Sequence, residues 1–517
     1  MRIVRPLGFV AGALGLVPFW FPIGRTGGRA DGRSIESVMA TVGAPEPSMS
    51  RPAGPPARLS AAVRCIRLEK PGTQVNGEVK VCPGRYRIPD HTERGVLVII
   101  GSNTRVDLTG VTLESGDSLA PEFTGIGVLS LRGDSITIRG GRIRGYRFGV
   151  RLEGGRGHRV AGIDLSGSRS QALRSSAVAF DPADWLNIAN PDSFESYGSG
   201  LYLKRTTGVQ VTGVIARGSQ NGIGLFESRD SWLADNDVSG NSGWGIHLWK
   251  SSRNTIIRNQ AERNVRCESE SYHQGCDSAA LLLREQSDSN LVADNDLSWS
   301  GDGFFLSGHR PLLSPSIGNL VLRNDASHAY HNAFEATFSA WNTFLENRAD
   351  SSDYGFWLGY SRGSAIRGNT IMGTRSAAIA IEHGAENEIA GNTIIGGNTG
   401  IRLFAPRAED EPSMAYRVDD NVIARVRQGV VLEHTSRSRL RGNLFDGVED
   451  ALTVDSAGAD LQLSGNVFLS AQRWLINAVD LDAGGNYWAA TDESTARRQI
   501  RGRVTLQPFR RAQDVGY

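Results

Sequence analysis

The chain has 517 residues, and its 56 Lys and Arg are balanced by 55 Asp and Glu, so its net charge is +1. This balance excludes the concentrated basic excess that is typical of a nucleic-acid binder, and we expect no nucleic-acid partner. A hydrophobic content of 39% excludes broad disorder.

Residues 1–30 are predicted to be an export signal. Arg2 and Arg5 precede an apolar run at residues 7–23, which fits the core of a signal peptide slightly better than a membrane span of about 20 residues. No clean small-residue cleavage motif follows, so an uncleaved signal anchor is the alternative, and it would be the only contact with a membrane. Residues 31–58 are rich in Gly, Arg, Pro, Ser and Ala, which predicts a flexible linker. We therefore expect a periplasmic or secreted protein.

Four cysteines form two pairs that are close in sequence, Cys65 with Cys82 and Cys267 with Cys276. Neither pair has the spacing of a zinc ribbon, and no Cys/His set completes a tetrahedral site. Two local disulfides in an oxidising compartment are expected, and free thiols in a cytosolic protein are the alternative. The first bridge would tie an N-terminal cap at residues 59–95.

From about residue 100 the sequence repeats every 22 to 23 residues, with longer steps at insertions. One column of the repeat is a small residue followed by alternating apolar positions: Gly127, Gly149, Gly200, Gly222, Gly245, Ala280, Gly303, Ala333, Gly355, Ala378, Gly400, Gly429 and Ala451. A second column is Asn: Asn236, Asn259, Asn295, Asn324, Asn347, Asn369, Asn392, Asn421, Asn443, Asn466 and Asn486.

Short segments of alternating apolar residues predict strands with one buried face. Gly or Asn between them permits the left-handed backbone of tight turns. Three such strands and three turns fill one repeat, which makes one rung of a parallel β-helix. Buried Asn side chains should then bond to their counterparts in the next rung. We predict an all-β fold, with a parallel β-helix of about fifteen rungs at residues 96–490 and a C-terminal cap or tail at 491–517.

Residues 251–259 (SSRNTIIRN) resemble the repeat unit of the right-handed parallel β-helix superfamily, which includes pectin-lyase-like and NosD-like repeat proteins. Residues 485–488 (GNYW) resemble its terminal rung. The resemblance covers about residues 95–490 and implies a single-stranded right-handed solenoid. Its members include polysaccharide lyases, often assisted by calcium, and glycosidases. The paired Asp-Asp and Arg-Ile-Lys motifs of polygalacturonases and the Asp-Pro-His-Asp motif of alginate epimerases are missing, so no catalytic residue is transferred.

Outward positions of the repeated strand predict a stripe that mixes aromatic and charged side chains. Aromatic rings stack on sugar rings while charged neighbours bind hydroxyls and carboxylates, so the stripe suits a glycan groove. The alternative is that loops fold over the stripe and bury its aromatic residues. The predicted substrate-binding residues are Tyr202, His247, Trp249, Phe305, Arg310, Trp357, Tyr360, Glu382 and Arg402.

Insertions at 173–199, at 267–276 and from His309 onward cluster around this stripe, and long loops on a rigid scaffold commonly carry function. The predicted catalytic residues beside them are Asp302, His328, His331, Glu335, Arg284 and His309. In β-elimination of a uronate glycan, His or Tyr would remove the C5 proton while Arg284 or Arg310 neutralises the carboxylate. In hydrolysis, Glu335 with Asp302 or Glu382 would flank the glycosidic bond.

His328 and His331 lack a third His, Cys or Met nearby, so no metal site is assigned. Calcium is the one cofactor that the lyase hypothesis brings with it. The sequence thus favours an exported monomer whose groove binds polysaccharide and cleaves or modifies it. The competing hypothesis is a non-catalytic binder or scaffold at the cell surface, or a NosD-like periplasmic accessory protein.

Overall fold

The computed structural model describes residues 65–267, 275–309, 314–406 and 413–510, all within the compact unit Val63–Tyr517. The predicted signal segment 1–30 and linker 31–58 lie outside these residues. Within the described ranges, no helix combines the length and the apolar character that a membrane crossing requires.

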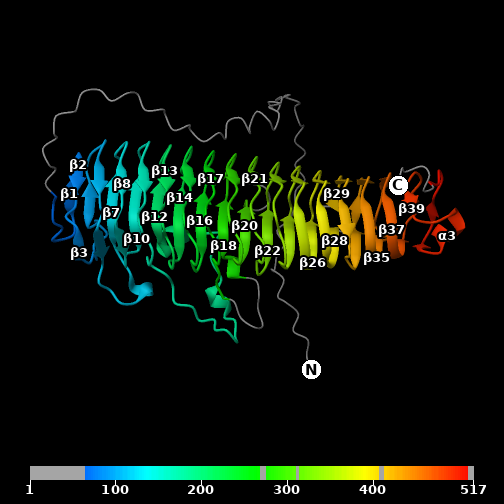
Figure 1. Cartoon of the computed structure of the whole chain (residues 1–517), viewed down its shortest axis with the longest axis horizontal. Coiled ribbons are helices and arrows are strands. Elements are labelled where there is room, and N and C mark those ends of the chain that lie inside the picture. The colour runs from blue at the N-terminus through cyan, green and yellow to red at the C-terminus, as the bar shows by residue number, and fades with distance from the viewer. Residues whose placement is uncertain (1–64, 268–274, 310–313, 407–412, 511–517) are drawn as a thin grey trace, which may run out of the picture. The chain divides into compact units, whose positions relative to one another are not determined.

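Stacked parallel strands make up this unit (Figure 1). One sheet has 15 strands and receives one short strand from each rung, so the prediction of about fifteen rungs is confirmed. Its strands are β2 (Glu78–Lys80), β5 (Arg105–Asp107), β8 (Thr137–Arg139), β11 (Arg159–Ala161), β13 (Gln210–Thr212), β15 (Trp232–Ala234), β17 (Thr255–Ile257), β19 (Leu291–Ala293), β21 (Leu320–Leu322), β23 (Thr343–Leu345), β25 (Ala365–Arg367), β27 (Glu388–Ala390), β30 (Arg417–Asp419), β34 (Arg439–Arg441) and β36 (Gln462–Ser464).

A second sheet, of 19 strands, contains the six-residue and longer strands of the rungs together with some shorter ones. Its strands are β1 (Thr73–Val75), β4 (Leu97–Ile99), β7 (Ile126–Leu131), β10 (Phe148–Glu153), β12 (Ser199–Lys204), β14 (Asn221–Phe226), β16 (Trp244–Trp249), β18 (Ala279–Arg284), β20 (Asp302–Ser307), β22 (Asn332–Thr337), β24 (Tyr354–Gly359), β26 (Thr370–Glu382), β28 (Thr393–Phe404), β31 (Val422–Ala424), β32 (Gln428–Glu433), β35 (Leu444–Val454), β37 (Val467–Asn477), β39 (Tyr487–Trp488) and β40 (Ile500–Arg501).

Smaller elements complete the rungs. They are the sheets β3 (Gly84–Arg87), β6 (Val111–Glu114) and β9 (Arg142–Arg144), β29 (Ser413–Met414) with β33 (Thr435–Ser436), and β38 (Leu481–Asp482) with β41 (Val504–Thr505). The described helices are α2 (Pro191–Tyr197) and α3 (Glu493–Arg497), and tight helical turns occur at Ala120–Glu122, Pro182–Asp184 and Gly275–Asp277.

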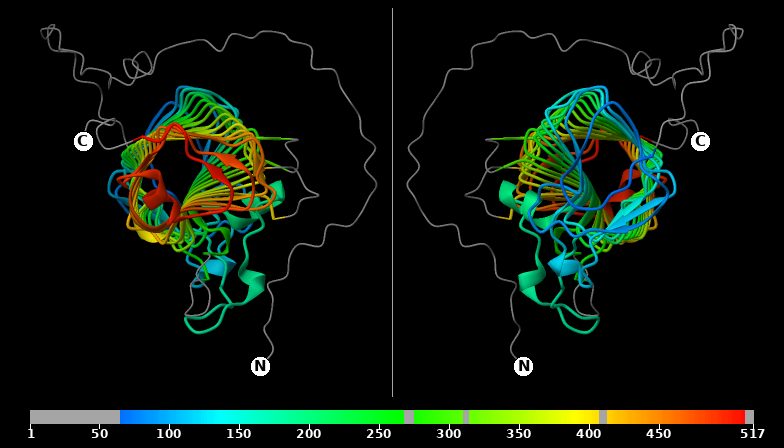
Figure 2. Two further views of the ribbon diagram at one scale, coloured as in Figure 1. Left: turned by 90° about the vertical axis from the view of Figure 1, so that its right-hand side faces the viewer. Right: turned by 90° about the vertical axis from the view of Figure 1, so that its left-hand side faces the viewer.

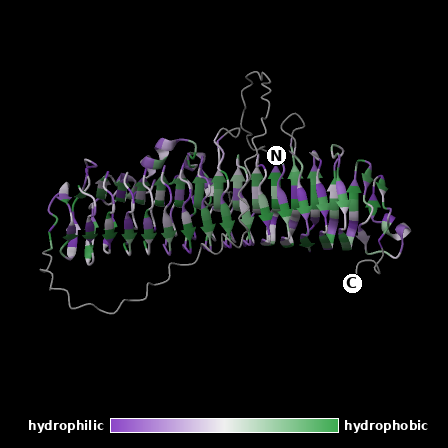
Figure 3. Ribbon diagram, turned by 90° about the horizontal axis from the view of Figure 1, so that it is seen from above, coloured by the Kyte–Doolittle hydropathy of each residue, from purple (hydrophilic) through white to green (hydrophobic). Residues whose placement is uncertain are grey.

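The core fills the inside of the coil because alternate strand residues point inward. Hydrophobic residues recur at the same place in successive strands (Figure 3), and they stack from rung to rung. Phe334 and Phe356 stack with ring centroids 4.8 Å apart, and Phe468 stacks on Trp488 at 4.2 Å. Each rung covers the apolar surface of the next, which is why a solenoid needs several repeats to be stable.

Buried Asn residues form a continuous ladder along one corner of the rungs, which superpose in the end-on view (Figure 2). From Asn236 to Asn466, each side-chain amide donates to the Oδ1 atom of the Asn in the next rung, at 2.8 to 3.1 Å, and the ladder ends at Asn486. The predicted Asn contacts are confirmed. Because these polar groups are buried, each bond also avoids the cost of an unsatisfied amide.

Parallel pairing extends beyond the predicted β-helix boundaries at both ends. β1, β2 and β3 lie in the segment predicted as a cap, yet they pair with β4, β5 and β6 of the next rung. Near the C-terminus, β40 pairs with β37. Both predicted disulfides, Cys65–Cys82 and Cys267–Cys276, are present.

Candidate functional site

Residues 184–197, which we call the covering segment, lie over the outward face of strands β12 to β20. Its helix α2 begins after Asn190, whose side-chain oxygen accepts the N–H of Asp192 at 2.9 Å. Phe194 of α2 packs on Tyr202 and His247, with ring centroids 5.4 and 4.2 Å apart. This part of the chain projects from one side of the stacked rungs (Figure 2).

Four predicted substrate-binding side chains are consequently buried: Tyr202, His247, Trp249 and Phe305, each at most 4% exposed. Of the two alternatives for the stripe, burial under a loop is therefore the one found here. We expected the open groove to begin at Tyr202, but the covering segment occupies that place.

Arg284, predicted as a catalytic cation, anchors the covering segment. Its guanidinium donates to the carbonyl of Ile188 at 3.0 Å, to Ser307 Oγ at 2.8 Å and to the carbonyl of Gly308. The side chain is only 5% exposed. The elimination hypothesis needed this cation to face a substrate carboxylate, whereas these bonds direct it toward the protein.

Beyond the covering segment, strands β22 to β32 leave their outward face open. Tyr354 and Trp357 are half-buried there and contact each other edge to face, with centroids 4.8 Å apart. A hollow of about 340 Å³ continues along this face, lined by Tyr354, Ser376, Ala377, Asn398, Thr399, Arg402, Gln428, Val431 and Glu433. An open groove is thus present on the C-terminal half of the predicted stripe.

The other predicted binding residues lie along or beside this half. Arg402 pairs with Glu433 at 2.7 Å. Tyr360, just after β24, stacks on Phe338 with centroids 5.2 Å apart. Glu382, at the end of β26, is half-buried. Arg310 lies outside the described residues.

A cluster of ionisable groups lies where the covered half meets the open half. Asp302 begins β20, and His331 precedes β22, so the two face each other across adjacent rungs with Nδ1 and Oδ1 3.4 Å apart. Glu335 points outward from β22 beside them, and one side-chain ligand atom from each of the three lies within 4.8 Å of the others. The amide of Asn332 donates to Glu335 Oε2 at 2.6 Å.

Asp277 adds a further carboxyl group close to this cluster, near enough for its charge to interact with Asp302 and His331. It follows the disulfide cysteine Cys276, and its Oδ2 atom accepts the indole N–H of Trp185 at 2.7 Å. The covering segment and the disulfide-tied turn therefore both hold this carboxyl group in place.

The environment shifts the pKa values of three of these groups. Burial lowers the pKa of His331, but the hydrogen bond and charge of Asp302, with the charges of Glu335 and Asp353, more than offset it and raise this pKa to about 9. Burial and the charge of Asp302 raise the pKa of Glu335 well above its usual range. Burial also raises the pKa of Asp277, to about 7.

This arrangement offers a carboxylic acid beside an ion-paired carboxylate, which is the pair that glycosidic bond cleavage uses. Asp302, His331 and Glu335 could also hold a metal ion through one atom each. With a pKa of about 9, His331 carries a proton at neutral pH, and a metal would first have to displace it.

Two predicted catalytic histidines lie apart from the cluster. His328 stacks on Trp299 at a corner of the coil, with centroids 4.3 Å apart. His309 is about half exposed, and its nearest acidic partner is Glu285 at 3.9 Å.

Sequence reasoning missed Asp277, Asn332 and the cluster contact of Trp185. Trp185 lies in the insertion 173–199, and Asp277 directly follows a disulfide cysteine, so insertion and disulfide were the available signals. Neither signal says that the two segments meet, because that contact depends on how the loops fold back on the sheet.

A comparison with protein families supports the fold. The family described as "Right handed beta helix region" matches residues 94–261, 199–371, 269–408 and 349–468. No curated protein matches the chain.

Several solved structures resemble the chain weakly. A mannuronan C-5 epimerase A-module (AlgE6) from Azotobacter vinelandii is 13% identical with a TM-score of 0.45, covering 76% of this chain and 91% of its own. A family 28 exopolygalacturonase from Yersinia enterocolitica is 13% identical with a TM-score of 0.37, covering 76% and 73%. The surface adhesin PfbA from Streptococcus pneumoniae is 11% identical with a TM-score of 0.40, covering 78% and 91%.

Such low identities and TM-scores carry no argument about activity. The family match is different in kind, because together its segments extend from residue 94 to residue 468. The predicted right-handed parallel β-helix is confirmed, and the chain belongs to the right-handed β-helix family.

Proposed function

We propose that this protein is an exported glycosidase that cleaves a polysaccharide where the open groove meets the covering segment. The observation that carries the proposal is the pairing of Glu335, whose pKa is raised well above its usual range, with Asp302, which is ion-paired to His331. One group can donate a proton while the other remains a carboxylate. Different environments for two neighbouring carboxyl groups are what general acid catalysis with a second carboxylate requires.

In the proposed reaction, Glu335 donates its proton to the glycosidic oxygen as the bond to the anomeric carbon breaks. The Asp302 carboxylate then stabilises the positive charge at that carbon or bonds to it, and water completes hydrolysis with Glu335 acting as base. The two carboxyl groups are close, within 4.8 Å between their nearest oxygen atoms. This separation suits the retaining mechanism, in which Asp302 bonds to the anomeric carbon. His331 and Asn332 position the two carboxyl groups.

The groove accounts for binding on one side of the cleaved bond. Tyr354 and Trp357 lie next to Glu335 along the open face, where their rings can stack on sugars. On the other side, the covering segment fills the positions that further sugar units would need. We therefore expect cleavage near a chain end, with short products.

The first experiment is a screen of linear polysaccharides with the mature protein, with and without calcium. New reducing ends without the ultraviolet absorbance of an unsaturated uronate would support hydrolysis. That absorbance would instead establish a lyase and contradict the proposed roles. Binding without either product would leave the competing hypothesis of a non-catalytic glycan binder.

A variant ties any activity to the cluster. Asp302→Asn should abolish product formation, while Asp325→Asn, on a neighbouring corner of the coil, should leave it unchanged. Equal activity in wild type and Asp302→Asn would exclude this site.

A further inference from the structure

The first four strands of the 15-stranded sheet present one cation each on their outer face. Lys80, Arg105, Arg139 and Arg159 come from β2, β5, β8 and β11, and all four are exposed. Arg105 and Arg159 occupy the first position of their strands, and Lys80 and Arg139 the third. Strand register aligns these positions from rung to rung. The positive charges therefore alternate between two columns, one step of about 4.8 Å per rung.

This face is hollowed. A depression of about 850 Å³ lies there, and the charged residues that line it are Glu78, Lys80, Arg105, Asp107, Arg139 and Arg159. Four cations against the two carboxylates of Glu78 and Asp107 give this lining a net charge of +2, compared with +1 for the entire chain.

Most of these cations have no acidic partner. Arg139 pairs with Asp107 at 2.9 Å. Across the described residues, Lys80, Arg105 and Arg159 form no ion pair. Their charges are free to meet a ligand.

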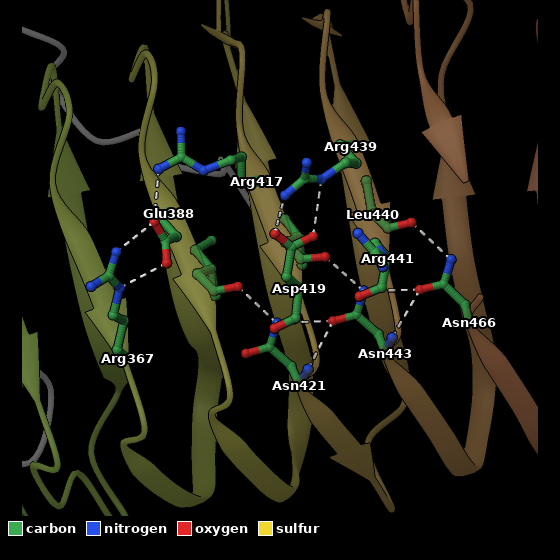
Figure 4. A network of polar contacts seen from close by, with 12 residues as sticks. Arg367, Glu388, Arg417, Asp419, Asn421, Arg439, Leu440, Arg441, Asn443 and Asn466 are labelled. Carbon is green, nitrogen blue, oxygen red and sulfur yellow. Dashed lines mark hydrogen bonds and ion pairs between the residues drawn. The ribbon is translucent and has the colours of Figure 1, made fainter. Parts of the chain in front are cut away.

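The same two columns look different toward the C-terminus, in β25 to β34 (Figure 4). There Arg367 and Arg417 both bond to Glu388 at 2.7 Å, and Arg439 bonds to Asp419. The Arg367 guanidinium hydrogen bond, the largest cause, lowers the pKa of Glu388 to about 2. The protein thus neutralises Arg367, Arg417 and Arg439 in this region. It leaves Lys80, Arg105 and Arg159 at the N-terminal end of the same sheet without an ion pair to any described residue.

We propose that the hollow over β2, β5, β8 and β11 is a second binding site, separate from the groove, for a linear acidic polysaccharide lying along the coil axis. Carboxylate or sulfate groups of the polymer would pair with Lys80, Arg105 and Arg159. Hydroxyl and amide side chains such as Thr137, Ser135 and Asn103 would bond to sugar hydroxyls.

An acidic glycan fits better than a nucleic acid for two reasons. The two disulfides indicate an oxidising compartment, where acidic polysaccharides are the common linear polyanions. The lining also contains no aromatic residue on which a base could stack.

The test measures binding of a fluorescent polyuronate to the full-length Glu335→Gln variant, so that cleavage does not interfere. A further triple change, Lys80→Ser with Arg105→Ser and Arg159→Ser, should weaken binding about tenfold or more at low salt, and added salt should reduce that difference. The matched control is the triple change Arg367→Ser, Arg417→Ser and Arg439→Ser, which removes the same charge from the same sheet and should leave binding nearly unchanged. A double variant, Arg105→Lys and Arg159→Lys, keeps both positive charges and should retain binding. This result would show that substitutions at these positions do not disturb the fold of the site.

Three results would overturn the proposal. An equal loss of polyuronate binding in the two triple variants would mean that only the net charge of the protein matters. Unchanged binding in both variants would mean that the polymer binds elsewhere. Equal binding of a single-stranded oligonucleotide would remove the glycan specificity. The proposed glycosidase activity does not depend on the hollow. The variant with Lys80→Ser, Arg105→Ser and Arg159→Ser but an intact Glu335 should therefore still cleave short neutral oligosaccharides, so a failure of one proposal can be told from a failure of the other.

Discussion

Two halves of one sheet face behave differently in this protein. Strands β12 to β20 and β22 to β32 share the same repeat and the same inward ladder of apolar residues. In the first half, outward aromatic residues are covered by residues 184–197, whereas in the second half Tyr354 and Trp357 stay partly exposed. The repeat therefore determines the scaffold, and an inserted loop determines where a ligand can bind.

The boundary between the halves concentrates the chemistry. Phe305 is buried under the covering segment, and its register partner Glu335 in the next rung is not fully covered. Removing water from one side of Glu335 raises its pKa, while the open side leaves room for a substrate. A carboxyl group in the middle of either half would lack one of these two conditions.

The largest expected effect is on catalysis at the boundary. Glu335→Gln removes the proton donor while keeping the shape, so turnover should fall by about 10²- to 10⁴-fold. The melting temperature should not fall, because the change removes a carboxyl group whose ionisation burial disfavours. Glu346→Gln, at an exposed turn of the next rung, is the control and should keep full activity. Full activity of Glu335→Gln would assign proton donation to another residue.

The next effect concerns stability of the covered half. Phe194→Ala should destabilise the packing of the covering segment by about 3 kcal/mol, because a buried aromatic ring is lost. Limited proteolysis should then cut within residues 184–197 at a lower denaturant concentration than in wild type. Val178→Ala, at an exposed position of the same insertion, is the comparison variant and should leave the proteolysis profile unchanged. An unchanged proteolysis profile for Phe194→Ala would show that other contacts, such as that of Arg284 with Ile188, are sufficient.

The repeated scaffold could be predicted from the sequence, whereas the effect of the inserted loop could not. Columns such as Asn421 and Asn443 predicted rungs and ladders because each repeat makes the same local contacts. Glu335, His331 and Asp302 were predicted together because adjacent rungs bring aligned positions close. Burial of Tyr202 and His247 was not predictable in the same way, since it depends on a loop of nonrepeating sequence folding back across several rungs.

A smaller effect separates the aromatic residues of the two halves. Trp357→Ala should weaken glycan binding by about 1 to 2 kcal/mol, roughly tenfold, because a sugar-stacking surface is lost. Phe305→Ala, in the covered half, should lower stability more than it lowers binding, since its side chain is only 4% exposed. Titration calorimetry with a cleavage-deficient background, alongside thermal melts, measures both quantities. Equal binding losses in the two variants would mean that the covering segment moves aside for the ligand.

The smallest effect is a pH dependence of stability that has one sign at the boundary cluster and the opposite sign in the covered half. His331 has a pKa of about 9, above its unfolded value of about 6.5, so its contribution to stability is complete below pH 6.5 and is lost as pH rises through 9. Burial, helped by Arg284, lowers the pKa of His247 well below that value. Its contribution is therefore present above pH 6.5 and is lost as pH falls.

Thermal melts across the pH range can separate these two contributions by variant. His331→Gln should lower the melting temperature most below pH 6.5, where protonated His331 contributes fully, and should converge with wild type above pH 9. His247→Phe should instead remove the loss of stability in acid, because a phenyl ring keeps the contacts with Phe194 and Trp244 but cannot take up a proton. If His247→Phe melted with the same acid dependence as wild type, protonation of this buried ring would not be what loosens the covered half in acid.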